Sequence, residues 1–177
     1  VGRSGWPADH QVADLHLSAR NQQLASIHTD PDGLIIELTD PRLFDYPFIY
    51  LSEPGYIYLE EEERKGLRTY LLNGGFLMVD DFWGDYEWQN FYDNIKRVFP
   101  DREPLELPLE HEIFHCVYDL KMKPQVPSIR SWQTTGLTYE PNHGGDVQTV
   151  HYKGIFDDKG RMMVIICHNT DLGDGWE

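Results

Sequence analysis

Basic residues are scarce in this sequence. It contains 15 Lys and Arg against 30 Asp and Glu, which gives a formal net charge of -15 at pH 7 with the eight histidines counted as neutral. Proteins that bind the phosphate backbone of nucleic acids use a basic surface, and an anionic membrane surface repels an acidic chain. The composition therefore argues against nucleic acid and against anionic membrane surfaces as partners.

Cysteines and long apolar runs are also few. The two cysteines, Cys116 and Cys167, permit at most one disulfide, and their number leaves both the compartment and their pairing open. Apolar stretches such as residues 162–167 are far shorter than the roughly 20 residues of a membrane-spanning helix. With 40% hydrophobic and 13% aromatic residues, we expect residues 1–177 to form a single soluble, acidic domain that does not span a membrane.

Apolar periodicity predicts helices and strands in the first 100 residues. Helical patterns cover residues 8–28, 60–73 and 84–99, and short apolar runs at 34–38, 47–51 and 76–80 are typical of buried strands. Turn residues at 29–33 close the first helix, and residues 39–46 form either a loop or a single helical turn. This order favours a parallel sheet flanked by helices.

The pattern changes in the second half of the chain. Residues 105–119 fit a strand or a helix, and residues 121–145, rich in Pro, Ser, Thr and Gly, predict an irregular excursion. Two strands follow at 147–156 and 161–167, joined by a hairpin-like turn. Within the excursion, Trp132 and Tyr139 are candidates for a lid or for a surface that binds a protein partner.

Four ordered segments resemble a known family. They are Leu43-Phe-Asp-Tyr-Pro-Phe-Ile-Tyr50, Gly74-Gly-Phe-Leu-Met-Val-Asp-Asp-Phe82, Arg97-Val-Phe-Pro-Asp-Arg102 and Ile166-Cys-His-Asn-Thr-Asp-Leu-Gly-Asp-Gly-Trp-Glu177. Together they are similar to the domain-of-unknown-function family 4159, a branch of the class I glutamine amidotransferase-like fold related to the ThuA-like trehalose-utilisation proteins.

The resemblance implies an α/β, flavodoxin-like three-layer sandwich with a mainly parallel sheet. It also implies an exported, periplasmic bacterial protein, in which a signal peptide and a strand precede the first helix here and a final helix follows the Gly-Trp-Glu. It brings no established activity. In active amidotransferases of this fold, the turn after a buried strand carries a nucleophilic cysteine, whereas residues 78–84 here contain none.

Polar side chains follow the predicted parallel strands, and open parallel sheets bind ligands at the carboxyl ends of their strands. Asp80 and Asp81 are the candidate catalytic residues. The candidate ligand-binding residues are Glu53, Trp83, His168, Asn169, Asp171 and Asp174. The ordinary alternatives are that Asp81 or Asp85 caps the following helix, that Asp80 bonds a neighbouring loop, that an Asx turn orders the loop 168–174, and that Cys167 is buried and unreactive.

Candidate metal ligands come from two places. His111-Glu-Ile-Phe-His115 matches the H-E-x-x-H pattern of zinc proteases, in which one helix presents both histidines to the metal and the glutamate acts on water. The zinc-protease hypothesis requires that this segment be a helix and that a third residue bind the metal. In the resembling family a proline commonly takes the place of the glutamate. His168 is the other candidate. The sequence predicts no cofactor and leaves a divalent metal open.

Aromatic residues near the same predicted edge are candidates for stacking on a sugar ring or for places in the core: Tyr56, Trp83, Tyr86 and Trp176. The leading interpretation is a ligand- or protein-binding module of an envelope assembly without the amidotransferase nucleophile. The alternative is a carboxylate- or metal-dependent hydrolase acting on carbohydrate, with Asp80 or Asp81 as the base and His168 and Asp171 holding a metal or the substrate. A zinc protease is a weaker alternative.

Overall fold

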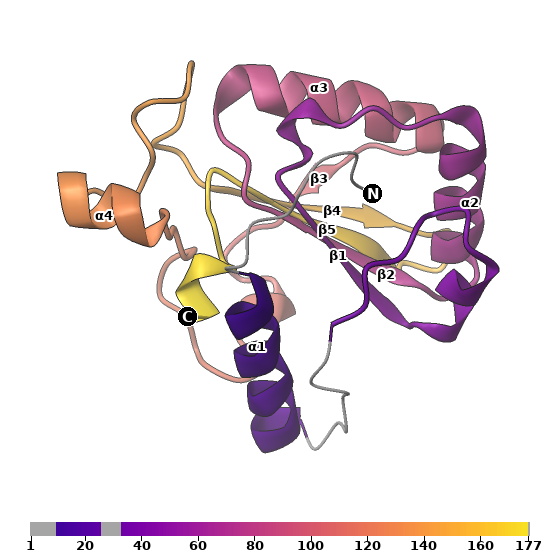
Figure 1. The fold of residues 1–177 in the computed structure, drawn as a ribbon, viewed down its shortest axis with the longest axis horizontal. Helices are drawn as coiled ribbons and strands as arrows, with labels where there is room; N and C mark the ends of the chain where they lie inside the picture. Colours follow the sequence, from indigo (N-terminus) through magenta and orange to yellow (C-terminus); the bar gives the residue numbers. More distant parts are fainter. Residues whose placement is uncertain (1–9, 26–32, 177) are drawn as a thin grey trace.

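Five strands form one open sheet in the computed structural model, which describes residues 10–25 and 33–176 (Figure 1). The strand order is β1-β2-β5-β4-β3, with bounds β1 (Phe48–Ser52), β2 (Phe76–Asp80), β3 (Leu105–Glu106), β4 (His151–Phe156) and β5 (Met162–His168). Strands β1, β2 and β5 are parallel, whereas β4 is antiparallel to β5 and to β3. The fold is thus mixed α/β with a mostly parallel sheet, as the sequence predicted.

The helices are α1 (His10–Ala25), α2 (Glu61–Leu72), α3 (Gly84–Val98) and the short α4 (Ile129–Thr135). The glutamates 60–63 form the N-cap and first turn of α2, at the positive end of its macrodipole, and the Glu63 side chain accepts a hydrogen bond from the backbone N–H of Glu60 at 2.8 Å. Among the described residues, no helix is both long and apolar enough to cross a membrane.

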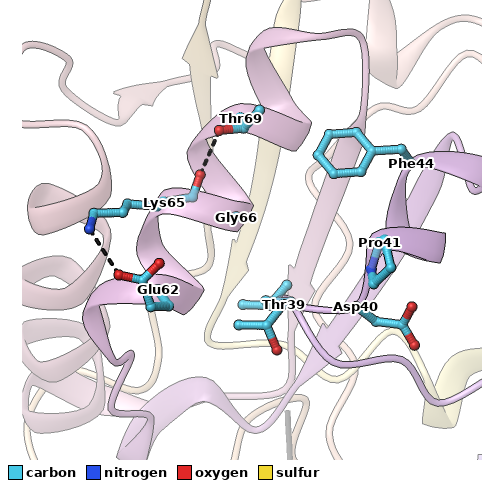
Figure 2. Close-up of a pocket in the computed structure, with 9 residues that line it drawn as sticks. Thr39, Asp40, Pro41, Phe44, Glu62, Lys65, Gly66 and Thr69 are labelled. Carbon is cyan, nitrogen blue, oxygen red and sulfur yellow. Dashed lines mark hydrogen bonds and ion pairs between the residues drawn. The ribbon is translucent and has the colours of Figure 1, made fainter.

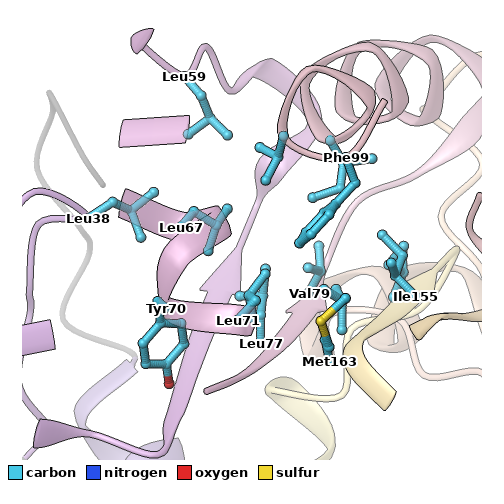
Figure 3. Close-up of a cluster of buried hydrophobic side chains, with 14 of the residues drawn as sticks. Leu38, Leu59, Leu67, Tyr70, Leu71, Leu77, Val79, Phe99, Ile155 and Met163 are labelled. Atoms are coloured by element: carbon cyan, nitrogen blue, oxygen red, sulfur yellow. The ribbon is translucent and has the colours of Figure 1, made fainter. Parts of the chain in front are cut away.

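The main core lies between the sheet and the pair α2 and α3 (Figure 3). Leu67, Tyr70 and Leu71 of α2 pack over Leu77 and Val79 of β2. The opposite face of the sheet carries a smaller cluster around Phe114, Tyr152 and Cys167, to which the irregular residues after β3 contribute. Because both faces are covered, β5 is apolar along nearly its whole length.

One predicted strand is wrong. Residues 34–37 have no regular structure, and Leu34 and Ile35 are 50% and 76% exposed. Leu38 is buried in the core and Ile36 packs against it. The carbonyl oxygen of Leu38 lies 2.2 Å from the position that a Cβ on Gly66 of α2 would take. The apolar run therefore anchors a loop against α2 instead of pairing in the sheet.

Other predicted boundaries of strands and helices differ from the observed ones because of local hydrogen bonds. The strand predicted from residue 147 begins at His151, because the Asp146 side chain accepts hydrogen bonds from the N–H groups of Gln148 and Thr149 and holds a turn there. Residues 105–119 give only the short β3 and a 3-10 turn. Helix α1 is confirmed through Ala25, whereas residues 8–9, 26–28 and most of the predicted turn at 29–33 lie outside the described residues.

Arg161 ties the β4–β5 hairpin to the end of α2. Its guanidinium donates to the carbonyl oxygens of Leu71 (2.6 Å) and Gly75 (3.1 Å) and pairs with Asp157. We expect Arg161→Ala to lower the free energy of unfolding by about 2 kcal/mol, because two carbonyls of the helix end lose their charged donor. Urea denaturation measures this, with Lys159→Ala in the same turn as the control; equal stabilities of the two variants would contradict it.

Candidate functional site

The backbone turns sharply at the carboxyl ends of the three parallel strands. Glu53 follows β1, Asp81 follows β2 and Asn169 follows β5, with φ angles of 51°, 58° and 62°. In the described part of the chain these are the non-glycine residues with positive φ. Such left-handed conformations are uncommon outside glycine and concentrate at functional sites. The sheet edge where this fold class binds ligands is therefore also the edge with the unusual backbone.

Asp80, the last residue of β2, is fully buried. Its Oδ2 accepts three hydrogen bonds, from the Tyr50 hydroxyl (2.9 Å) and the backbone N–H groups of Leu172 (2.7 Å) and Gly173 (3.1 Å). Its Oδ1 has no hydrogen-bond partner in the described structure. Burial raises the pKa of Asp80 to about 7. This carboxyl group thus joins β1, β2 and the loop after β5 through one oxygen and leaves the other unused.

Asp81 and Asp171 complete a group of buried carboxyl groups. In a regular strand the side chains of Asp80 and Asp81 would point to opposite faces of the sheet. Asp81 instead has a left-handed backbone conformation, and the charge of Asp80 acts on its carboxyl group. Burial and the nearby charges of Asp80 and Glu53 raise the pKa of Asp81. Burial and the charge of Asp81 raise the pKa of Asp171, which is 7% exposed. Four predicted residues, Glu53, Asp80, Asp81 and Asp171, are therefore brought together.

His168 lies apart from these carboxyl groups, on the face of the sheet covered by α3. Its Nε2 contacts the carbonyl oxygen of Gly84 at 3.1 Å, and its ring packs against Phe82, Trp88 and His151, at 4.9, 5.3 and 5.8 Å between ring centroids. Burial lowers the pKa of His168 to about 4, so the ring is neutral at pH 7. The hypothesis that His168 and Asp171 hold one metal or substrate together is not supported by this geometry.

The other predicted ligand-binding residues hold the framework. The fully buried Asn169 accepts a hydrogen bond from the N–H of Gly84 and donates to the carbonyl oxygens of Asp146 and Thr149. Trp83 is only 2% exposed, so it offers no face for stacking on a ligand. The Asp174 side chain accepts from the N–H of Ile129 at the start of α4. The loop 168–174 is ordered as the ordinary interpretation predicts, because the Asp171 side chain accepts from the N–H of Asp174 and Asp80 bonds the same loop. The predicted cap of α3 by Asp81 or Asp85 is wrong, since the N-cap residue of that helix is Trp83, whose side chain makes no cap hydrogen bond.

Residues 124–146 of the predicted irregular excursion lie across the carboxyl ends of β2 and β5. The N–H of Asp171 donates to the carbonyl oxygen of Val126 at 2.7 Å, and the N–H of Asp85 donates to that of Gly144 at 3.2 Å. Sequence reasoning missed one contribution of this segment: the charge of Glu140 acts on both Asp81 and Asp171. Nothing in a sequence pattern relates residue 140 to a strand that ends 60 positions earlier.

The H-E-x-x-H segment does not form the helix that a zinc protease requires. Residues 112–114 make a single 3-10 turn, in which the Nδ1 of His111 accepts from the N–H of Ile113. His115 instead contacts Asp119 and the carbonyl oxygen of Leu109. The two histidines therefore do not share one face of an α-helix, so this segment lacks the geometry that the zinc-protease hypothesis requires. Across the described residues, no three His, Cys, Asp or Glu side chains are grouped so as to hold a metal ion.

The cysteines take no part in the edge site. Cys116 is exposed, Cys167 is fully buried, and both are free thiols. Burial raises the pKa of Cys167, which disfavours the thiolate form that a nucleophile needs. The turn after β2, where the predicted fold would place a nucleophile, holds Asp81 instead.

A groove lies elsewhere, between the loop 38–44 and helix α2 (Figure 2). It has a volume of about 530 Å³ and is lined by backbone and by the partly exposed Phe44, Glu62 and Lys65. Lys65 and Glu62, both on α2, bond to one another along that helix. The groove lacks buried polar groups that would orient a ligand, so we place the candidate site at the carboxyl edge of the sheet.

A comparison with family models identifies the family. The model described as "Domain of unknown function (DUF4159)" matches residues 1–177, the whole chain. The chain belongs to the DUF4159 family. No curated protein matches it.

Proposed function

We propose that this DUF4159 domain is a ligand-binding module that holds a polar ligand at the carboxyl edge of its sheet. The observation that carries the proposal is Asp80: a fully buried carboxyl group with one oxygen bonded three times, the other without a partner, and two more carboxyl groups beside it. Burying like charges together is costly, and a structural role requires only one of them. The cluster of carboxyl groups is therefore not explained by the stability of the fold, whereas a site that binds a polar ligand requires such groups.

We infer further that the fold is of the flavodoxin-like, class I glutamine amidotransferase-like type and lacks the cysteine nucleophile. Support comes from the parallel strands β1, β2 and β5, the helices α2 and α3 on one face, and the sharp turn after β2 that holds Asp81. Export to the periplasm and a place in an envelope assembly, where a protein partner binds the same domain, complete the proposal. These two points rest on the family resemblance.

A carboxylate-dependent hydrolase acting on carbohydrate is the second candidate. The observation in its favour is the pKa of Asp80, about 7, because a general acid or base works best when its pKa lies near the operating pH. Full burial of Asp80 opposes it, since a catalytic carboxyl group must reach the scissile bond. Asp81, which is partly exposed, is the residue that would act in this case.

Chemical-shift mapping distinguishes the two functions. The isotope-labelled protein is titrated with a panel of neutral sugars, amino sugars and amino acids, and with chromogenic glycosides. The binding module predicts ligand-induced shifts of the amides of Glu53, Asp81 and Leu172, lost in Asp81→Asn, and no release of the chromophore. Release that is abolished in Asp81→Asn would establish the hydrolase instead, and shifts confined to the groove beside α2 would place the site elsewhere.

A further inference from the structure

The carboxyl-edge cluster has no positive charge of its own. Among the described residues, Glu53, Asp80, Asp81 and Asp171 form no ion pair with any Lys, Arg or His. The charges that act most strongly on the three aspartates are those of other carboxylates. Among the buried carboxyl groups of the described residues, Glu87 pairs with His143 at 2.9 Å, whereas Asp80 and Asp171 have no cationic partner. Burial without a counter-charge therefore distinguishes this edge.

The second observation is the unused oxygen of Asp80. A fully buried carboxylate oxygen without a donor loses its hydration and gains nothing in return. A positive charge near the cluster would stabilise the ionised forms of Asp80 and of the neighbouring carboxyl groups by Coulomb attraction.

The third observation is a pair of exposed aromatic rings on the segments that directly follow the turns at Glu53 and Asp81. Tyr56 lies three residues after Glu53, and Tyr86 lies in the first turn of α3, five residues after Asp81. Their ring centroids are 5.9 Å apart with planes at 46°, and the residues are 76% and 68% exposed. The faces of tyrosine rings attract cations, and proteins that recognise quaternary ammonium ligands use such rings. Carboxylates and rings at this edge thus favour the same kind of ligand.

From these three observations we propose that the ligand of this site carries an organic ammonium group, which contacts Tyr56 and Tyr86 and is neutralised by Glu53 and the aspartate cluster. The inference rests on the proposed function and specifies the chemical class of the ligand. An organic ammonium ion suits the site because it is held by rings and by carboxylates at ordinary contact distances. A metal ion needs several ligand atoms converging on one point, and the described residues provide no such group.

Choline and its neutral carbon analogue dimethylbutanol test the proposal, since they share a shape and differ in charge at every pH. Binding is followed by the amide shifts of the full chain at low salt. We expect choline to bind at least about tenfold more tightly, the combined effect of one exposed ion pair and one cation–π contact. Its affinity is expected to fall as salt is raised, because salt screens exposed charges.

Variants assign the effect to residues. Tyr86→Leu and Glu53→Gln are expected to weaken choline binding several-fold, while Tyr118→Leu, at a tyrosine that is similarly exposed (66%), leaves it unchanged. Equal binding of choline and dimethylbutanol, or choline binding insensitive to both edge variants, would overturn the ammonium inference. If neutral sugars shift the edge amides and choline does not, the inference fails while the binding module stands; if neither does, both fail.

Discussion

Replacing Asp81 by asparagine is expected to stabilise the protein at pH 8 by on the order of 3 kcal/mol and to leave its stability near pH 4 almost unchanged. The pKa of Asp81 is raised in the folded state by burial and by the charges of Asp80 and Glu53, whereas in the unfolded chain it is ordinary. Between about pH 4 and pH 7 the folded state therefore retains a proton that the unfolded state releases, and stability falls as pH rises through this window.

Asparagine suits the test for two reasons. It keeps the size of the side chain, and it tolerates the left-handed backbone found at residue 81, where φ is 58°. Removing this charge also relieves the charge repulsion on Asp171. Most substitutions at buried sites destabilise, so a gain in stability that accompanies loss of ligand binding identifies a site kept for function.

Urea denaturation of the wild type and of Asp81→Asn, at several pH values between 4 and 8, measures the difference. Asp101→Asn is a control of opposite sign, because a hydrogen bond from Arg68 lowers the pKa of the exposed Asp101, so this variant should lose stability above the ordinary pKa of aspartate. The prediction is contradicted if Asp81→Asn is less stable than the wild type at pH 8, or if the difference in stability does not vary with pH. Either result would show that ionisation of Asp81 does not destabilise the folded protein.

Gly84→Ala is expected to lower the free energy of unfolding by about 4 kcal/mol and the melting temperature by about 10 °C. Gly84 has φ 73°, and a Cβ there would stand 2.0 Å from the carbonyl oxygen of Gly144. Its N–H donates to Asn169, and its carbonyl oxygen contacts His168. An alanine must therefore push the excursion away from α3 and weaken the bonds that hold it, in addition to adopting an unfavourable backbone conformation.

Gly136→Ala separates these two costs. Gly136 ends α4 with a similar φ of 69°, but no atom lies within 4 Å of the position of a Cβ. We expect this variant to lose about 1 kcal/mol, the cost of the left-handed conformation alone. Thermal unfolding of both variants gives the comparison, and equal losses would show that the close approach of Gly84 to the excursion is unimportant.

The sequence predicted the parts of the fold that local patterns determine. The apolar run 76–80 became β2, the helical spacing of Phe91, Ile95 and Val98 became the buried face of α3, and residues 157–160 formed the hairpin turn. The alternation along β5 also placed Cys167 and His168 on opposite faces, as the sequence indicated. These features depend on near neighbours in the chain.

Features that depend on distant contacts were not predictable. The run 34–38 resembles a strand, but its apolar side chains differ in burial and its backbone packs on α2. Asp80, Asp81 and Asp171 were expected at one edge, since parallel strands end together. The hydrogen bond from Tyr50 and the charge of Glu140 were not, because they depend on strand register and on how the excursion folds back.

The most direct test of the carboxyl-edge site is a titration of the aspartate carboxyl carbons by NMR, with and without choline. We expect the carboxyl group of Asp80 to titrate near pH 7 and those of Asp81 and Asp171 to titrate well above the ordinary range. Choline is expected to lower the apparent pKa values of Asp81 and Asp171. Titration of all three groups near pH 4, unchanged by choline, would contradict both the buried cluster and its need for a cationic ligand.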